Sequence, residues 1–154
     1  MGFYQIRREV QLAADIETVW DFISNPANLK KITPDYMMFD ITSSDIPDTI
    51  YEGMIITYIV SPIAGIKTRW VTEITHIKEK EYFVDEQRVG PYKIWHHQHF
   101  LSKTEKGTLM HDIVSYKPPF GFFGEIANTL LIKKRLNHIF EFRAKALDNI
   151  FGTI

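Results

Sequence analysis

Cysteine is absent from this chain of 154 residues, which excludes disulfide bonds, thiolate nucleophiles and cysteine-ligated zinc sites together. The sequence also has no run of about 20 apolar residues, so we expect no stable membrane insertion. Its formal net charge is −1, with acidic and basic residues interspersed. This pattern offers neither a basic stripe for nucleic acid nor a polybasic membrane anchor.

Several functional motifs are missing as well. No glycine-rich phosphate loop, G-x-S-x-G elbow or H-E-x-x-H motif occurs, so nucleotide binding, serine hydrolysis and zinc proteolysis have no support. The N-terminal segment MGFYQIRREVQL lacks the apolar stretch of a secretory signal. We therefore predict a soluble cytoplasmic protein. Because the length is typical of one domain, residues 1–154 are predicted to form a single domain.

Strand-like patterns fill the middle of the chain, and helical patterns occur near both ends. Residues 3–12 alternate between polar and apolar, which predicts a first strand. Asp15 is placed to cap a short helix over residues 16–23, and a second short helix is predicted at about 26–32. Six further strands are predicted at about 36–44, 53–60, 66–77, 81–89, 93–103 and 108–117.

The last segment predicts one long amphipathic helix. Its apolar residues recur three and four positions apart, and charged residues fall largely between them. A helix over residues 122–150 would be about 43 Å long, which requires a long sheet to pack against. The apolar positions are Ile126, Leu130, Leu136, Ile139, Phe140, Leu147 and Ile150.

The turns between the later strands predict their register. If residues 104–107 close the last hairpin, His99 lies opposite Asp112 and Trp95 lies opposite Tyr116. The same turn places His97 opposite Val114. If residues 78–81 close the earlier hairpin, Thr72 lies opposite Gln87 and Ile74 lies opposite Asp85.

One face of these strands combines large aromatic side chains with polar ones. Aromatic side chains belong against a core, whereas carboxylates and imidazoles there are costly unless they are hydrogen-bonded or contact a ligand. This face carries Trp70, Phe83, Trp95 and Tyr116 together with Asp85, Gln87, His97, His99 and Asp112. The opposite face is more ionic and is predicted to face solvent. It carries Arg69, Glu73, Glu86, Arg88, His96, Gln98 and His111.

The order of elements and several phrases resemble the START-like (SRPBCC) superfamily. The phrases are VWDFISNPANL, ITP and GPYKIWHHQHF, followed by G-T-x-M-x-D-x-V-x-Y-x-x-P-x-G over residues 107–121. The resemblance covers nearly the whole chain and is strongest to the bacterial ligand-binding branch, described as polyketide cyclase/dehydrase-like. It implies an α+β helix-grip fold. In that fold a curved antiparallel sheet of about seven strands wraps around a long C-terminal helix, with two short helices after the first strand.

The resemblance also implies a hydrophobic cavity between sheet and helix. Members of the superfamily bind lipids, sterols, polyketides or other apolar molecules, and a minority do chemistry on them. We therefore expect this chain to bind a hydrophobic or amphipathic small molecule without a cofactor or a metal; a homodimer is left open. The expected ligand-binding residues are Trp70, Phe83, Asp85, Gln87, Trp95, His97, His99, Asp112, Tyr116 and Phe140.

Four roles are open to the His97, His99, Asp85 and Asp112 group. It has the composition of a two-histidine, two-carboxylate metal site, a role that we rank last. A histidine oriented by a carboxylate also suits proton abstraction beside a carbonyl. The role that we rank first is a satisfied polar network that fixes strand register and lines the pocket. Orientation of a ligand by His97 or Gln87 is compatible with that network.

Two other functions remain open. The chain is more readily a binding protein than an enzyme, but a cyclase, dehydratase or isomerase would use the histidine–aspartate group as acid and base. The segment Phe120–Phe123 carries three phenylalanines, which would form an exposed apolar patch in a partner-binding or chaperone-regulating module. The partner-binding hypothesis predicts a closed or filled cavity.

Overall fold

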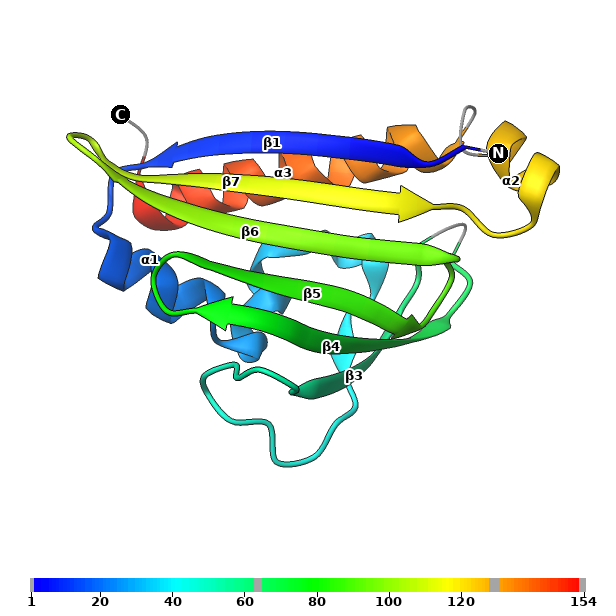
Figure 1. Cartoon of the computed structure of the whole chain (residues 1–154), viewed down its shortest axis with the longest axis horizontal. Helices are drawn as coiled ribbons and strands as arrows, with labels where there is room; N and C mark the ends of the chain where they lie inside the picture. The colour runs from blue at the N-terminus through cyan, green and yellow to red at the C-terminus, as the bar shows by residue number, and fades with distance from the viewer. Residues whose placement is uncertain (1, 63–64, 128–130, 153–154) are drawn as a thin grey trace.

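Seven antiparallel strands form one sheet in the order β1-β7-β6-β5-β4-β3-β2 (Figure 1). The computed structural model describes residues 2–62, 65–127 and 131–152. The strands are β1 (Tyr4–Leu12), β2 (Asp40–Ile41), β3 (Ile55–Val60), β4 (Thr68–Lys78), β5 (Tyr82–Val89), β6 (Ile94–Thr104) and β7 (Gly107–Lys117). The predicted helix-grip architecture is confirmed, because this sheet is combined with a long C-terminal helix and with short helices after the first strand.

The predicted register of the later strands is confirmed pair by pair. His99 lies opposite Asp112 and Trp95 lies opposite Tyr116 in the β6–β7 ladder. The hairpin between these strands turns at Gly107, whose φ of 119° suits only glycine. A Cβ at this position would also collide with the carbonyl oxygen of Leu12. In the β4–β5 ladder Thr72 pairs with Gln87 and Ile74 with Asp85, with irregularities at Val71/Thr72 and Ile74/His76.

The predicted second strand is largely wrong. Residues 36–44 were expected to be extended, but β2 covers only Asp40–Ile41, and a short 3₁₀ helix η2 (Asp35–Met37) precedes it. Pro34 stands at the start of this turn, and its carbonyl oxygen accepts from the Met37 N–H at 2.9 Å. Met38 then takes a left-handed φ of 48°, which interrupts the extended backbone before Asp40.

Two short helices follow β1 and cover one end of the sheet (Figure 1). Helix α1 (Ile16–Ile23) begins where the Asp15 carboxylate accepts the Thr18 N–H at 2.7 Å, as its capping position predicts. The second helix, η1 (Pro26–Ile32), is a 3₁₀ helix that starts at a proline. Proline is well tolerated at the first helical position, because a backbone N–H there would have no acceptor within the helix.

The C-terminal segment forms two described helices, α2 (Gly121–Ala127) and α3 (Lys133–Phe151). The predicted helix over residues 122–150 also spans residues 128–130, which lie outside the described residues. Helix α3 is 19 residues long, or about 28 Å, and it runs along β1 and β7 (Figure 1). Its buried face packs into the same hydrophobic core as the inner face of the sheet, through Leu136, Ile139, Phe140 and Leu147. No helix among the described residues is both long and apolar enough to cross a membrane.

Candidate functional site

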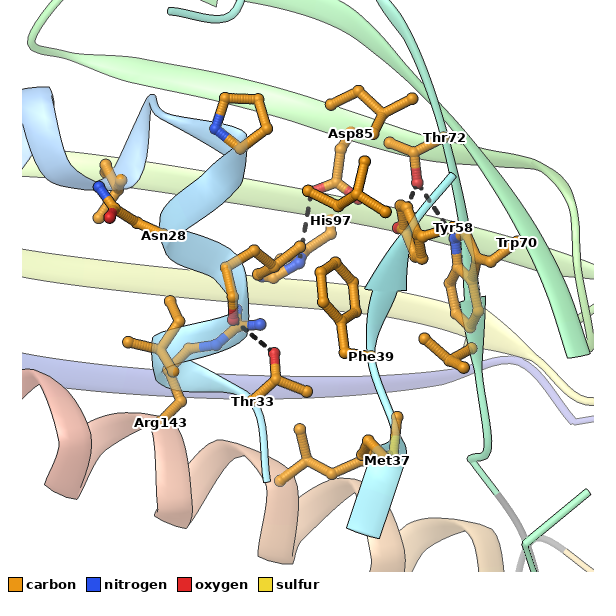
Figure 2. Close-up of a pocket in the computed structure, with 18 of the residues that line it drawn as sticks. Asn28, Thr33, Met37, Phe39, Tyr58, Trp70, Thr72, Asp85, His97 and Arg143 are labelled. Atoms are coloured by element: carbon orange, nitrogen blue, oxygen red, sulfur yellow. Dashed lines mark hydrogen bonds and ion pairs between the residues drawn. The ribbon is translucent and has the colours of Figure 1, made fainter. Parts of the chain in front are cut away.

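A cavity of about 170 Å³ lies between the inner face of the sheet, helix α3 and the 3₁₀ helices η1 and η2 (Figure 2). Its wall is mainly apolar. Ile56, Val60 and Ile74 come from β3 and β4, and Leu136 and Ile139 come from α3. The alternation of each strand points these side chains inward, while the helical spacing of α3 points its apolar stripe at them.

A histidine–aspartate cluster forms the polar part of this wall. His97 and His99 are alternate residues of β6 and therefore share its inner face. Asp85 of β5 lies on one side of them, and Asp112 of β7 lies on the other. Asp85, His97 and His99 line the cavity, whereas Asp112 is placed behind the two rings. Both histidines and Asp112 are buried, although their side chains are polar.

Each imidazole lies between the two carboxylates. His99 Nε2 donates to Asp85 Oδ2 at 2.8 Å, and His97 Nε2 donates to Asp112 Oδ1 at 3.2 Å. His97 Nδ1 is 3.5 Å from Asp85 Oδ2, which is too long for a strong hydrogen bond. His99 Nδ1 is 2.8 Å from Asp112 Oδ1 but is poorly aligned with it. The hydrogen bond from Nε2 leaves His97 Nδ1 as the nitrogen with a free lone pair when the ring is neutral.

Aromatic contacts fix the planes of the two rings. The imidazoles of His97 and His99 lie with their centroids 3.7 Å apart. Phe83 stacks on the other side of His99 at 4.1 Å, and Phe140 of α3 meets His97 edge-on at 5.6 Å. Because the rings are held from several elements, their nitrogens keep fixed directions relative to the cavity.

Burial and the two carboxylates move the pKa values of the histidines in opposite directions. Burial, with the positive charge of His99 nearby, lowers the pKa of His97 to about 4. Burial also opposes charge on His99, but the nearby carboxylates of Asp112 and Asp85 outweigh it and raise the pKa of that ring. His97 is therefore neutral at neutral pH.

The pKa values of both carboxyl groups lie below the usual range. Burial alone would raise the pKa of Asp112, but hydrogen bonds from His97 and His99 hold it well down. Burial likewise acts to raise the pKa of Asp85, and the charge of His97 and the hydrogen bond from His99 bring it below its usual value. Both aspartates are therefore ionised at neutral pH.

A second polar group lies on the wall at β3 and β4. The Thr72 hydroxyl is 2.6 Å from the Tyr58 hydroxyl and accepts from Trp70 Nε1 at 3.1 Å (Figure 2). Burial raises the pKa of Tyr58 above its usual value, so this phenol stays protonated. The polar atoms of Tyr58, Thr72 and Trp70 are paired with one another, so these residues offer mainly ring surface to a ligand.

Arg143 of α3 is the cationic side chain on the described wall. Its guanidinium lies 5.1 Å from the centre of the Phe140 ring, and its Nε is buried without a hydrogen-bond partner. An unpaired buried donor is costly unless something else satisfies it. Arg143 is therefore a candidate donor to an oxygen atom of a ligand.

Six of the ten predicted ligand-binding residues line the cavity: Trp70, Asp85, Trp95, His97, His99 and Phe140. The other four share their face but lie off the cavity wall. Phe83 and Asp112 support the histidine rings, as described above. The Gln87 amide donates to the Tyr92 carbonyl oxygen at 2.7 Å, and Tyr116 is buried beside Tyr92.

Sequence reasoning missed Tyr58, Thr72 and Arg143. Thr72 had already been placed on the correct face by its pairing with Gln87, and Tyr58 lies opposite Trp70 in the β3–β4 ladder. Arg143 lies three residues after Phe140, which places both on one side of α3. Its helical spacing was the available signal, but a charged residue in an amphipathic helix is expected to face solvent.

Neither a protein-family model nor a curated protein matches this sequence. Solved structures match its fold. Protein CV1439 from Chromobacterium violaceum has a TM-score of 0.73 at 14% identity, over 97% of this chain and 99% of that chain. Ara h 8.0201 has a TM-score of 0.66 at 10% identity, over 97% and 98% of the two chains. The major latex-like protein 151 from Panax ginseng has a TM-score of 0.66 at 9% identity, over 97% of each chain.

These likenesses show the helix-grip fold of this chain. The likeness is one of fold.

Proposed function

We propose that residues 1–154 form one START-like domain that binds a hydrophobic or amphipathic small molecule in the cavity. The observation that carries this proposal is an apolar cavity whose wall includes a few fixed polar atoms. This combination is typical of small-molecule sites, where apolar contacts supply affinity and polar groups set orientation. The predicted cytoplasmic location belongs to the same proposal.

The cavity volume limits the size of the ligand. Drug-sized sites have volumes of about 300–1,000 Å³, whereas this cavity has about 170 Å³. An engineered cavity of about 150 Å³ accommodates benzene. A ligand with one or two aromatic rings therefore fits better than a diacyl lipid or a sterol. Burial of about 300 Å² of its surface would contribute several kcal/mol before the cost of association.

Two polar groups on the wall are available to such a ligand. His97 Nδ1 carries a lone pair when the ring is neutral, so it accepts a hydrogen bond from a hydroxyl group. Arg143 donates to a carbonyl or carboxylate oxygen. The ligand class supported best is therefore a small aromatic molecule with a hydroxyl and an acceptor oxygen, a class that includes polyketide fragments.

An enzyme of the cyclase, dehydratase or isomerase type is the second candidate. It is favoured by the position of Asp85, His97 and His99 on the cavity wall, within reach of a bound molecule. Against it, three of the four ring nitrogens lie within 3.2 Å of a carboxylate oxygen. The fourth ring nitrogen, His97 Nδ1, is 3.5 Å from Asp85 Oδ2 and is therefore the candidate base.

The partner-binding module has an observation of its own. Phe120 and Phe123 expose 84% and 76% of their surface, and large exposed aromatics can mark an interaction site. That hypothesis also predicted a closed or filled cavity. We rank it third, because a cavity of about 170 Å³ lies between the sheet and α3 and is not filled by side chains.

Binding of 2-naphthol and of naphthalene to EDTA-treated protein tests the proposal. Both probes match the size of the cavity, and only 2-naphthol has a hydroxyl. We expect both to quench tryptophan fluorescence, because Trp70 and Trp95 lie on the wall. A net hydrogen bond of about 0.5–1.5 kcal/mol predicts about 2- to 10-fold tighter binding of 2-naphthol.

His97→Ala should remove this preference for 2-naphthol without abolishing naphthalene binding. The matched control is His96→Ala, since His96 is on the same strand, faces the other side of the sheet and pairs with Glu86. It should leave both affinities unchanged. If neither probe binds to the wild-type protein, the proposed function is wrong. If the preference for 2-naphthol survives in His97→Ala, the role of His97 is wrong.

A further inference from the structure

We propose that Asp85, His97 and His99 form a binding site for one divalent first-row transition-metal ion, of the Zn²⁺ or Fe²⁺ class, on the wall of the cavity. Such a site departs from the sequence-based expectation of no metal. It rests on the convergence of three donor atoms, on the position of Asp112 and on the charge of the cluster. It does not depend on the proposed apolar ligand.

The three donor atoms are already close together. One ligand atom from each of Asp85, His97 and His99 lies within 4.8 Å of the others. Asp85 Oδ2 is 2.8 Å from His99 Nε2 and 3.5 Å from His97 Nδ1. Metal–ligand bonds of about 2.1 Å place neighbouring donors roughly 3.0–3.4 Å apart. A small movement of side chains, with no change in the backbone, would therefore bring these donors to an ion.

Asp112 occupies the position of an outer carboxylate. It lies on the far side of both rings, where its Oδ1 is 3.2 Å from His97 Nε2 and 2.8 Å from His99 Nδ1. A metal-binding histidine usually donates its other ring N–H to a carboxylate, which fixes the tautomer and turns the free lone pair toward the metal. Here Asp112 is hydrogen-bonded to His97, and its Oδ1 also lies near His99 Nδ1, where a small rotation of the ring would allow a second hydrogen bond. This position of Asp112 leaves His97 Nδ1 and His99 Nε2 on the side of Asp85.

The charge of the cluster favours a divalent ion. Asp85 and Asp112 bring two negative charges into the core, and within the described part of the chain no lysine or arginine forms an ion pair with either carboxylate. A divalent cation bound between Asp85 and the two imidazoles, whose centroids are 3.7 Å apart, would bring two positive charges to these two carboxylates.

The type of ion follows from the donors. Two imidazoles and one carboxylate suit zinc and iron(II) better than calcium or magnesium, which prefer oxygen ligands alone. Three protein ligands leave at least one coordination position open, which is typical of sites that bind a further molecule. Because Asp85, His97 and His99 line the cavity, that open position faces the space where a ligand oxygen would lie.

Zinc titration of EDTA-treated protein, without a histidine tag and without an organic ligand, tests the site. We expect one Zn²⁺ per chain by calorimetry, and Co²⁺ should give visible absorption bands of a site with nitrogen ligands. Asp85→Asn and His99→Ala should each weaken binding at least 10-fold. Asp112→Asn, which alters only the outer carboxylate, should weaken it about 10- to 100-fold.

His96→Ala is the matched control and should bind Zn²⁺ as tightly as the wild type. If His99→Ala does not fold, Asp85→Asn carries the test, because it keeps the side-chain volume. The proposal is overturned if folded wild-type protein binds no stoichiometric Zn²⁺ or Co²⁺, or if Asp85→Asn binds as tightly as the wild type. Since 2-naphthol binding is measured in EDTA, failure of the metal site is distinguishable from failure of the proposed function.

Discussion

Removal of the Asp112 carboxylate should destabilise the metal-free protein strongly. Its side chain is only 5% exposed, and one of its oxygens lies within 3.2 Å of a nitrogen on each of two buried histidines. In Asp112→Ala both nitrogens lose that acceptor, and His99 loses part of its counter-charge. Breaking a buried pair by removing one partner typically costs about 3–5 kcal/mol. This is a large part of a total stability of about 5–15 kcal/mol.

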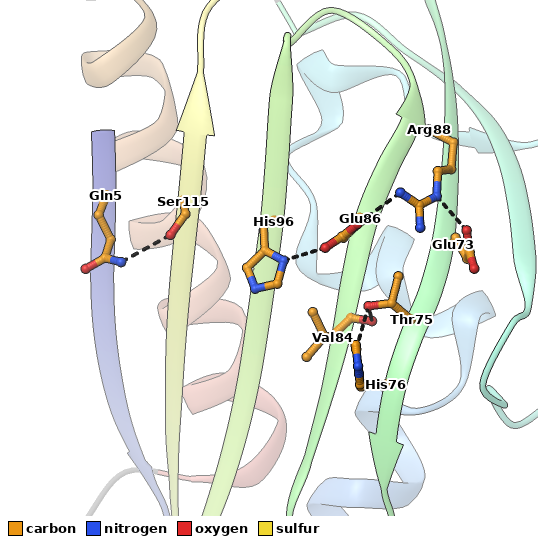
Figure 3. A network of polar contacts seen from close by, with 9 residues as sticks. All are labelled: Gln5, Glu73, Thr75, His76, Val84, Glu86, Arg88, His96 and Ser115. Atoms are coloured by element: carbon orange, nitrogen blue, oxygen red, sulfur yellow. Dashed lines mark hydrogen bonds and ion pairs between the residues drawn. The ribbon is translucent and has the colours of Figure 1, made fainter. Parts of the chain in front are cut away.

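The opposite face of the same sheet offers a matched comparison. There Glu86 accepts from His96 at 2.7 Å and from Arg88 at 3.0 Å, and Arg88 also pairs with Glu73 (Figure 3). This network has similar chemistry, but the Glu86 side chain is 29% exposed, so solvent screens its charge. Pairs of this kind contribute about 0–1 kcal/mol. Glu86→Ala should therefore cost much less than Asp112→Ala.

Urea unfolding at pH 7 in EDTA, followed by circular dichroism, measures both variants. With a slope of about 2 kcal/mol per M, the midpoint should fall by about 1.5–2.5 M for Asp112→Ala and by less than about 0.5 M for Glu86→Ala. Equal shifts for the two variants would refute the interpretation of the histidine–aspartate cluster as a buried, interdependent network.

Three other predictions concern the same core and cavity wall. Thr72→Val removes the hydroxyl that Trp70 and Tyr58 share, and both of their polar groups stay buried. The free energy of unfolding in urea should therefore fall by about 1–3 kcal/mol. An unchanged value would mean that the two groups find other partners. Leu147→Ala, at a fully buried position of α3, should cost about 2–5 kcal/mol, and a cost below about 1 kcal/mol would contradict its core position. Because burial lowers the pKa of His97 to about 4, the unfolded chain binds more protons at this residue between that pH and about 6.5, so the contribution of His97 to stability should be lost as pH falls through that window, whereas the raised pKa of His99 acts in the opposite direction. Unfolding midpoints at pH 7 and pH 5 measure this loss, and His97→Phe should reduce it.

The inner face of the sheet could be predicted because hairpin turns carry register information. Once the turn at residues 104–107 is placed, strand pairing puts His99 opposite Asp112, and the structure confirms that pair. Asp85 lies on the same face as the two histidines, because the β5–β6 ladder pairs it directly with His97. A period of two residues leaves no intermediate orientation, so a correct turn fixes the direction of every side chain in a hairpin without bulges, such as β6–β7.

Other features depend on contacts that the local pattern does not contain. The segment before β2 looked extended, but Pro34 and the left-handed Met38 turn it into η2. Charged residues of an amphipathic helix usually face solvent, yet the Nε of Arg143 is buried beside the cavity. The orientation of the two imidazole rings is also set by distant residues. Phe83 of β5 packs on His99, and Phe140 of α3 packs on His97. The sequence around the histidines does not contain these contacts.

Native mass spectrometry of the protein purified from its own host tests the central claim most directly. If the cavity binds a small apolar or amphipathic molecule, the spectrum should contain the chain with one added small-molecule mass, which solvent extraction then releases for identification. Replacing Ile139 on the wall with tryptophan should fill the cavity and remove that added mass. A wild-type spectrum that contains only the bare chain, together with no binding of 2-naphthol or naphthalene, would contradict the claim.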